Sequence, residues 1–110
     1  MALRFAKPWI DLAQGLDKLR GQMGVFQLAD HQQQVIYIGY AGGKSLHGLR
    51  GEIGQAAHSY TNAKFMRFEI TTSYLSRYKE ILMIHQADFG ELPEYSPKIK
   101  LGRLSPARSL

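Results

Sequence analysis

Residues 24–40 read GVFQLADHQQQVIYIGY, in which two apolar runs flank a short polar segment. The first run is Gly24–Ala29 and the second is 35–40, and both are rich in the β-branched and aromatic residues that favour strands. Two such runs separated by a few polar residues are typical of an antiparallel hairpin. The second run is almost entirely apolar, so we expect it to be the inner strand of the sheet.

Segments on either side of this hairpin also carry a periodicity. Residues 64–71 alternate, with Met66, Phe68 and Ile70 on one side, which predicts a third strand. Helical spacing of apolar residues predicts a helix over 8–21, a helix with Ser45 as its N-cap, and a helix from 73 to about 88. The last helix has a predicted core stripe of Leu75, Tyr78, Leu82, His85 and Phe89. These elements predict an α+β fold: a small three-stranded antiparallel sheet flanked by helices, with an extra N-terminal helix and an extended C-terminal tail.

The composition limits the class of protein. The chain has 110 residues, a hydrophobic content of 45% and no cysteine, so we expect a single domain over 1–110 without disulfides or thiolate metal sites. The 14 Lys and Arg residues outnumber the 9 Asp and Glu residues, and the net charge of +5 favours a polyanionic partner such as nucleic acid. No apolar run approaches the ~20 residues of a membrane helix, so we expect no membrane partner and a cytoplasmic location.

Two tripeptides in the hairpin carry a further signal. Gly24-Val25-Phe26 lies in the first run and Tyr37-Ile38-Gly39 in the second, and at this spacing the chain resembles the GIY-YIG endonuclease superfamily. That family follows its second motif with a small-residue loop, a helix that carries an Arg, a third strand and a helix that carries a Glu. Arg50 and Glu80 fall in the matching segments. The resemblance covers residues 22–96 and leaves the basic tail, 97–110, outside this core.

The resemblance implies a metal-dependent endonuclease that hydrolyses DNA phosphodiester bonds. By this carry-over, Tyr37 acts as the general base or positions the water, Arg50 pairs with the scissile phosphate, and Glu80 holds a single Mg²⁺ or Mn²⁺. An arginine suits its place because a planar guanidinium pairs with two phosphate oxygens and keeps its charge. The further residues expected to contact DNA are Gly39, Lys44, His47 and His58.

Three departures from the family pattern support an alternative function. Phe26 stands where the family usually has Tyr, and the segment Pro93-Glu94-Tyr95-Ser96 lacks the usual Asn. Arg50 lies about one helical turn farther from Tyr37 than is typical, and His47 is the other residue that could align with the family's Arg. The alternative is a catalytically weakened GIY-YIG-like module that binds nucleic acid or protein. A third hypothesis is an interaction domain whose positive charge is incidental.

Several of these residues also have a purely structural interpretation. Tyr37 is a common residue type for a strand, and Glu80 could pair with Arg77 three residues earlier on the same helix. The segment 39–45 looks like a phosphate-binding P-loop but is one residue too short. Its Lys44 could still hold a DNA phosphate at a helix N-terminus. The tail could follow a nucleic-acid backbone or remain solvated through its basic residues Lys98, Lys100, Arg103 and Arg108.

Overall fold

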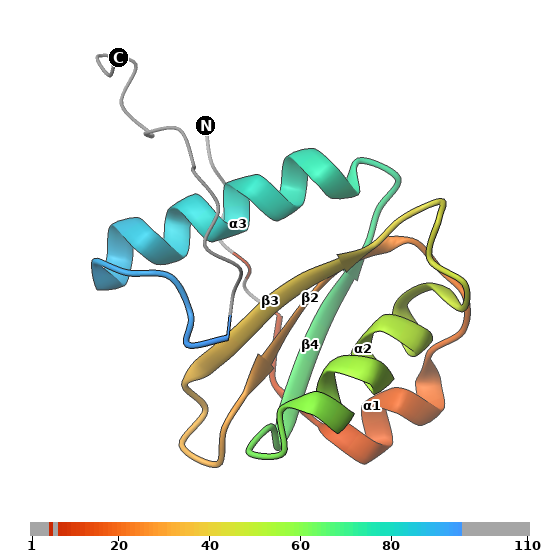
Figure 1. Cartoon of the computed structure of the whole chain (residues 1–110), viewed down its shortest axis with the longest axis horizontal. Coiled ribbons are helices and arrows are strands. Elements are labelled where there is room, and N and C mark those ends of the chain that lie inside the picture. Colours follow the sequence, from red (N-terminus) through yellow and green to blue (C-terminus); the bar gives the residue numbers. More distant parts are fainter. Residues whose placement is uncertain (1–4, 6, 96–110) are drawn as a thin grey trace.

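A four-stranded antiparallel sheet lies at the centre of the molecule, with helices on both of its faces (Figure 1). The structure is a computed structural model that describes residues 5 and 7–95, so the predicted basic tail over 97–110 lies outside the described residues. The strand order in the sheet is β1-β4-β2-β3. In chain order the elements are β1 (Ile10–Asp11), α1 (Leu12–Lys18), β2 (Gly24–Ala29), β3 (Val35–Ala41), α2 (Gly48–Ser59), β4 (Phe65–Ile70) and α3 (Tyr74–Phe89). The predicted α+β class is confirmed.

The hairpin predicted from residues 24–40 is confirmed, but the expected inner strand was wrong. β2 is the inner strand, because it pairs with β3 on one side and with β4 on the other, and all six of its residues are buried. β3 lies at the edge of the sheet. The apolar sequence of β3 has a different cause, since α2 and α3 pack against this strand from opposite faces of the sheet.

The N-terminal helix is shorter than the predicted 8–21. α1 begins at Leu12, and the two-residue strand β1 before it pairs with β4 through Ile10 opposite Met66. Asp11 ends this pairing and caps the helix, because its carboxylate accepts the Gln14 N–H at 3.4 Å. The start of the predicted helix therefore extends the sheet, which has four strands where three were expected.

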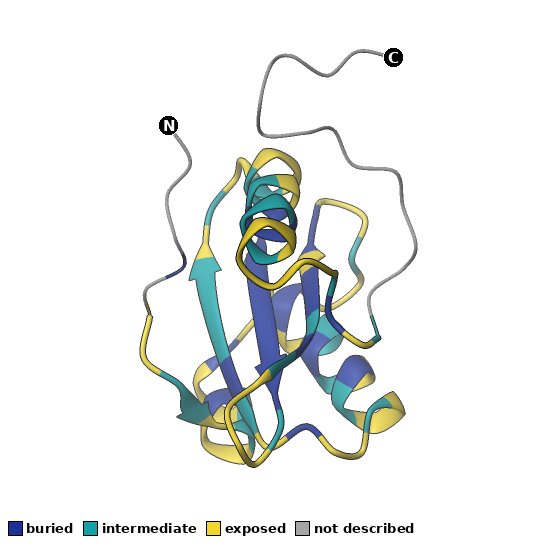
Figure 2. Cartoon of the chain, turned by 90° about the vertical axis from the view of Figure 1, so that its left-hand side faces the viewer, coloured by how far each residue is buried: buried dark blue, intermediate teal, exposed yellow. Residues whose placement is uncertain are grey.

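The side chains of the sheet alternate between two cores, one beneath each helical layer. Figure 2 shows that buried residues run along the central strands of the sheet. Phe26 and Leu28 of β2 point toward α1 and α2 and lie in one buried cluster with Leu49. Val25 points the other way, into the cluster formed with Ile38 and with Tyr78, Ile81 and Leu82 of α3. A strand that is apolar on both faces requires cover on both faces, and β2 receives it from α2 and α3.

α2 begins two residues later than a cap at Ser45 would place it. Its first helical residue is Gly48, and the Ser45 hydroxyl instead accepts the Gly42 N–H at 3.0 Å. The first-turn amides of the helix are bonded by the segment after α1, because Leu49 N–H donates to the Gln22 carbonyl at 2.8 Å. Arg50 N–H donates in the same way to the carbonyl of residue 20 at 3.3 Å. The start of α2 is thus fixed by a tertiary contact and not by a side-chain cap.

α3 matches the helix predicted from 73 to about 88, and Gly90 ends it in the left-handed conformation. Tyr78 and Leu82 lie in the core as expected, and His85 packs at a tilt against Phe89 with ring centroids 4.6 Å apart. Leu75 and Phe89 were wrongly placed in the core stripe, since they are 51% and 68% exposed. None of the helices in residues 7–95 is long and apolar enough to cross a membrane.

Gly48 and Gly54 give opposite predictions within the same helix. Gly48 has φ +59, and a Cβ there would lie 2.2 Å from the backbone carbon of Gly21. Gly48→Ala should therefore lower the free energy of unfolding by about 2 kcal/mol or more, because the left-handed conformation alone costs an L residue about 1–2 kcal/mol. A Cβ on Gly54 would meet nothing within 4 Å, so Gly54→Ala should raise the free energy of unfolding by about 0.5–1 kcal/mol. Urea denaturation checks both, and equal stability of the two variants would contradict the account of the α2 start.

Candidate functional site

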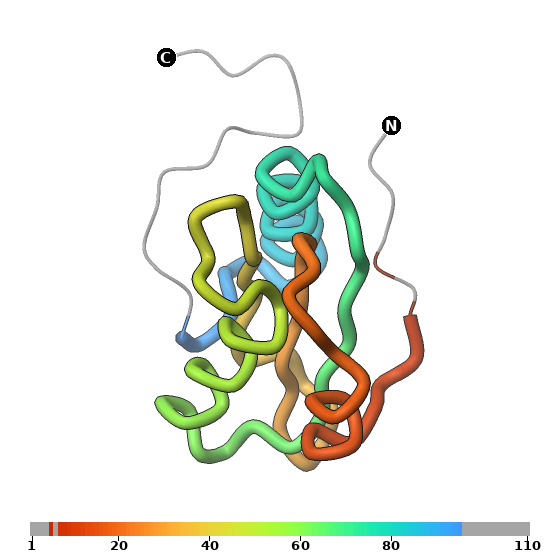
Figure 3. The backbone as a smooth tube through the Cα atoms, turned by 90° about the vertical axis from the view of Figure 1, so that its right-hand side faces the viewer, coloured from red at the N-terminus to blue at the C-terminus, as the bar shows by residue number. Residues whose placement is uncertain are grey.

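A cleft of about 950 Å³ lies where the edge strand β3, the loop over 42–47 and the first turns of α3 meet. Figure 3 shows this loop beside the N-terminal end of α3 and above α2. We call it the tyrosine cleft, because four of its lining residues are tyrosines. Its lining consists of Tyr37, Gly39 and Tyr40 from β3, Gly42, Gly43, Lys44 and Ser45 from the loop, Glu52 from α2, and Tyr74, Leu75 and Tyr78 from α3.

Three tyrosines of the cleft form one aromatic group. The Tyr40 and Tyr74 rings stack with centroids 5.7 Å apart and an angle of 17° between their planes, and Tyr78 packs at a tilt against Tyr40 at 4.9 Å. The Tyr74 hydroxyl accepts the Gly43 N–H at 3.2 Å, which ties the loop to α3. Gly42 permits this approach, since a Cβ at that position would lie 2.5 Å from the Tyr74 ring. The cleft therefore has a preformed aromatic wall, and Tyr40 remains 38% exposed.

Tyr37 lies at the inner side of the cleft, and its environment favours the neutral phenol. Its ring packs against Phe26 with centroids 5.8 Å apart and against Tyr60 at 5.1 Å. Burial, followed by the nearby Tyr60, Tyr78 and Glu52, raises the pKa of Tyr37 to about 12. At neutral pH the hydroxyl is therefore protonated and is able to donate a hydrogen bond to an acceptor in the cleft.

Arg50, expected at the phosphate, does not line the tyrosine cleft. Its side chain is exposed on α2, and its backbone N–H bonds to the segment that follows α1. Glu52, two residues later, does line the cleft. Residues two apart on a helix point about 200° apart, so these two side chains leave α2 on different sides.

Glu80, expected to hold the metal, also lies away from the tyrosine cleft. Its carboxylate accepts a hydrogen bond from the Arg77 guanidinium in an ion pair along α3, as the sequence spacing allowed. The same guanidinium pairs with Glu69 of β4, with 3.2 Å between Nε and Oε2. Glu80 is therefore on the side of α3 that faces β4, whereas Tyr74 and Tyr78 face β3. The structure does not bring Tyr37, Arg50 and Glu80 together.

The residues expected to contact nucleic acid divide into two groups. Gly39 and Lys44 line the tyrosine cleft, whereas His47 and His58 are exposed and do not line it. His47 occupies the N-cap position of α2 and makes no side-chain capping bond, and His58 lies in the last turn of that helix. Within residues 5 and 7–95 there is no group of three or more His, Asp or Glu side chains that could hold a metal ion.

Sequence reasoning missed Glu52, Tyr74 and Tyr78 as members of a site. Glu52 precedes the buried Ile53 on α2, and a helical wheel places Glu52 beside the core stripe. The helical periodicity therefore gave a weak indication that Glu52 faces the sheet. Tyr78 was expected only in the core. Its second role depends on the distance between α3 and Tyr40 of β3, which no local pattern contains.

The raised pKa of Tyr37 predicts a loss of stability in strong alkali. The folded chain keeps a proton on Tyr37 up to about pH 12, whereas an unfolded chain releases it near the ordinary value of about 10. The contribution of Tyr37 to the free energy of unfolding is therefore fully present below about pH 10, and it is lost as the pH rises toward 12. Tyr37→Phe should reduce this loss without abolishing it, because burial also raises the pKa of Tyr78. Urea denaturation at about pH 9 and about pH 11 measures the loss, and an equal loss in the variant and the unsubstituted chain would contradict this prediction.

Comparison with known proteins identifies a family and no activity. No curated protein matches the chain, and no solved structure matches it. One family model, described as a domain of unknown function (DUF7508), matches residues 1–88, which include every strand and nearly all of α3. The chain therefore belongs to the DUF7508 family.

Proposed function

We propose that this chain is a GIY-YIG-like module that binds nucleic acid, with bases stacked in the tyrosine cleft. The observation that carries the proposal is the preformed wall of Tyr40, Tyr74 and Tyr78 beside Lys44. Stacking on an aromatic side chain contributes about 1–3 kcal/mol per base and tolerates any sequence, because every base has a π-face. An ammonium group beside such a wall pairs with the phosphate that follows the stacked base.

Lys44 supplies a cationic group in the loop that is available for a phosphate. The Gly42 and Gly43 amides already donate to Ser45 and Tyr74. The first-turn amides of α2 donate to backbone carbonyls of residues 20 and 22. A phosphate at the helix N-terminus, as the P-loop-like sequence suggested, would have to displace these bonds. We therefore assign phosphate contact to the Lys44 side chain.

The net charge of the chain comes from its terminal segments. Five of the 14 Lys and Arg residues are Arg4, Lys98, Lys100, Arg103 and Arg108, and none of the 9 Asp and Glu residues lies outside 11–94. Residues 5–95 consequently carry nine of each sign and have no net charge. The non-specific, salt-dependent part of the affinity is therefore assigned to the tail, and stacking to the cleft.

The arrangement of the two tripeptides supports the GIY-YIG-like part of the proposal. Phe26 of the first lies opposite Gly39 of the second in the β2–β3 ladder, and the order of α2, β4 and α3 after the hairpin is the order that the resemblance implies. The separation of Arg50 and Glu80 from Tyr37 favours binding over hydrolysis. The raised pKa of Tyr37 also favours binding, since it makes the phenolate that a general base requires less accessible than at an ordinary tyrosine.

The second candidate function is DNA cleavage by a rearranged site. The observation that favours it is that the Glu52 carboxylate lines the same cleft as Tyr37 and Lys44, close enough to act on the Tyr37 pKa. In this arrangement Glu52 would take the place expected for Glu80 and hold Mg²⁺ or Mn²⁺ mainly through water. The cation would supply positive charge for the phosphate oxygens.

Binding is tested by fluorescence anisotropy with labelled single-stranded and duplex oligonucleotides of about 16 nucleotides. Tyr40→Ala should weaken binding of the single strand about 5- to 150-fold, the equivalent of one stacked base. Phe89→Ala is the matched control, because Phe89 is an exposed aromatic that does not line the cleft. Equal losses in both variants, or none in Tyr40→Ala, would contradict the assignment of the cleft.

The role of the tail is tested by the salt dependence of the same binding. Replacing Lys98, Lys100, Arg103 and Arg108 with Gln should flatten the plot of log affinity against log salt by about 0.7 for each phosphate that the tail no longer neutralises. Lys64→Gln is the control, because Lys64 is an exposed lysine immediately before β4. An unchanged slope would overturn the assignment of the electrostatic contribution to the tail.

The same oligonucleotides, incubated with Mg²⁺ or Mn²⁺, separate binding from cleavage. Binding without cleavage supports the module. Cleavage that is lost in Glu52→Gln and retained in Glu80→Ala would support the rearranged site. Cleavage that is lost in Arg50→Ala and Glu80→Ala would restore the constellation predicted from the sequence and contradict the binding proposal.

A further inference from the structure

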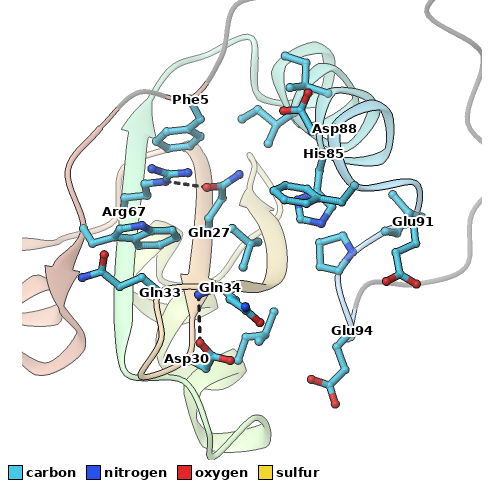
Figure 4. Close-up of a pocket in the computed structure, with 18 residues that line it drawn as sticks. Phe5, Gln27, Asp30, Gln33, Gln34, Arg67, His85, Asp88, Glu91 and Glu94 are labelled. Carbon is cyan, nitrogen blue, oxygen red and sulfur yellow. Dashed lines mark hydrogen bonds between the residues drawn. The ribbon is translucent and has the colours of Figure 1, made fainter.

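A second cavity, of about 850 Å³, lies at the other end of α3 from the tyrosine cleft. It is bounded by the hairpin turn over 30–34, by the C-terminal half of α3 and by the loop over 91–94 (Figure 4). Its inner wall is the sheet, from which Gln27 of β2 and Arg67 of β4 face the space. These two side chains carry the inference.

The Arg67 guanidinium is held in place by neutral groups. Its Nε donates to Gln27 Oε1 at 2.7 Å, and its Nη1 donates to the Lys7 carbonyl at 3.0 Å. The guanidinium lies over the Trp9 ring at 4.1 Å and over the Phe5 ring at 5.3 Å. A guanidinium has five N–H donors, so three of them make no hydrogen bond with the described residues.

Arg67 has no counter-anion within the chain's side chains. All 9 Asp and Glu residues lie among the described residues, between positions 11 and 94, and none of them forms an ion pair with Arg67. Burial lowers the pKa of Arg67, and no neighbouring carboxylate offsets that effect. A half-buried cation beside a cavity is stabilised by an anion that enters from outside.

Gln27 presents a second unused donor at the same place. It is 4% exposed and is the one buried polar residue in the described part of the chain. Its Oε1 is occupied by Arg67, whereas its Nε2 has no hydrogen-bond partner among residues 5 and 7–95. Buried side-chain donors are rarely left unpaired. The Gln27 amide and the free edge of Arg67 therefore offer adjacent donors to one acceptor group.

The remaining surface of the cavity favours a ligand with an apolar body and disfavours one with more than a single negative charge. Trp9, Ile36, Ile81 and Phe89 supply apolar wall. Four carboxylates also line the cavity, those of Asp30, Asp88, Glu91 and Glu94. Glu91 and Glu94 are exposed and lie at its rim. These carboxylates repel an anion in proportion to its charge, so they disfavour a ligand with two or more negative charges more strongly than a ligand with one. Phosphate esters and nucleic acid are therefore poor occupants.

We propose that this cavity binds a small organic monocarboxylate with an apolar or aromatic body. The carboxylate accepts hydrogen bonds from the Arg67 guanidinium and the Gln27 amide, and the body lies against Trp9 and the α3 wall. The inference is independent of the proposed nucleic-acid site, because none of these residues lines the tyrosine cleft.

The test is titration of the full chain with 3-phenylpropanoate, followed by fluorescence. Trp9 is the single tryptophan of the chain and lines the cavity, so it reports occupancy directly. The comparison ligands each carry a phenyl ring and a different head: 3-phenylpropanamide is neutral, 3-phenylpropylamine is cationic, and phenyl phosphate, which lacks the alkyl chain, is dianionic. We expect the carboxylate to bind at least 10-fold more tightly than each of the others. Tightest binding of the amine would show that the acidic rim governs the cavity and would overturn the proposal.

Two sets of variants locate the binding. Arg67→Gln should weaken the binding of 3-phenylpropanoate at least 10-fold and leave the binding of 3-phenylpropanamide unchanged. The control Lys64→Gln should change the binding of neither ligand. The double variant Glu91→Gln with Glu94→Gln alters exposed residues and tests the rim without disturbing the core. It should strengthen the binding of phenyl phosphate more than the binding of the monocarboxylate. Equal effects on all four ligands in either set would overturn the proposal. Oligonucleotide binding should be unchanged in Arg67→Gln, so failure here and failure of the proposed function are distinguishable.

Discussion

The burial of β2 on both faces is the constraint on which the rest of the structure depends. Every residue of Gly24–Ala29 is buried, and the strand pairs along both of its edges. Successive side chains point to opposite faces, so Phe26 and Leu28 require one helical layer and Val25 requires another. Gln27 is the exception on this strand, and its burial is tolerated because Arg67 on the neighbouring strand bonds its amide oxygen. Both cavities follow from this arrangement, since each lies where one end of α3 meets the sheet.

The local sequence pattern was sufficient to predict the elements whose buried faces it reports. It was insufficient to predict the elements that depend on distant contacts. The hairpin, β4 and α3 were predictable because alternation or helical spacing of apolar residues reports their buried faces. β1 consists of two residues, and only the pairing of Ile10 with Met66 makes it a strand. The start of α2 was misplaced at Ser45 because the bond from Leu49 to the carbonyl of Gln22 determines it. The inner and edge strands were exchanged because apolar residues on β3 indicate cover by helices, not pairing on both edges.

The candidate site was only partly predictable for a related reason. The resemblance indicates in which element a residue lies, and three of the residues that it named, Tyr37, Gly39 and Lys44, line the tyrosine cleft. It contains no information about the direction in which a side chain leaves its helix. Arg50 and Glu52 show the difference, because two positions on one helix separate the residue that lines the cleft from the residue that does not. The Gln27–Arg67 bond joins residues 40 positions apart and was beyond any local pattern.

The distribution of charge separates the two candidate sites. The body of the chain has no net charge, but four of its nine carboxylates, Asp30, Asp88, Glu91 and Glu94, line the second cavity. Lys44 and Glu52 are the charged residues of the tyrosine cleft. A polyanion is consequently repelled from one end of α3 and not from the other. Such fields decay over about 8 Å at physiological ionic strength, whereas α3 extends over 16 residues, or roughly 24 Å. The two ends of the helix therefore act on their ligands independently, and occupation of one site should leave the electrostatics of the other unchanged.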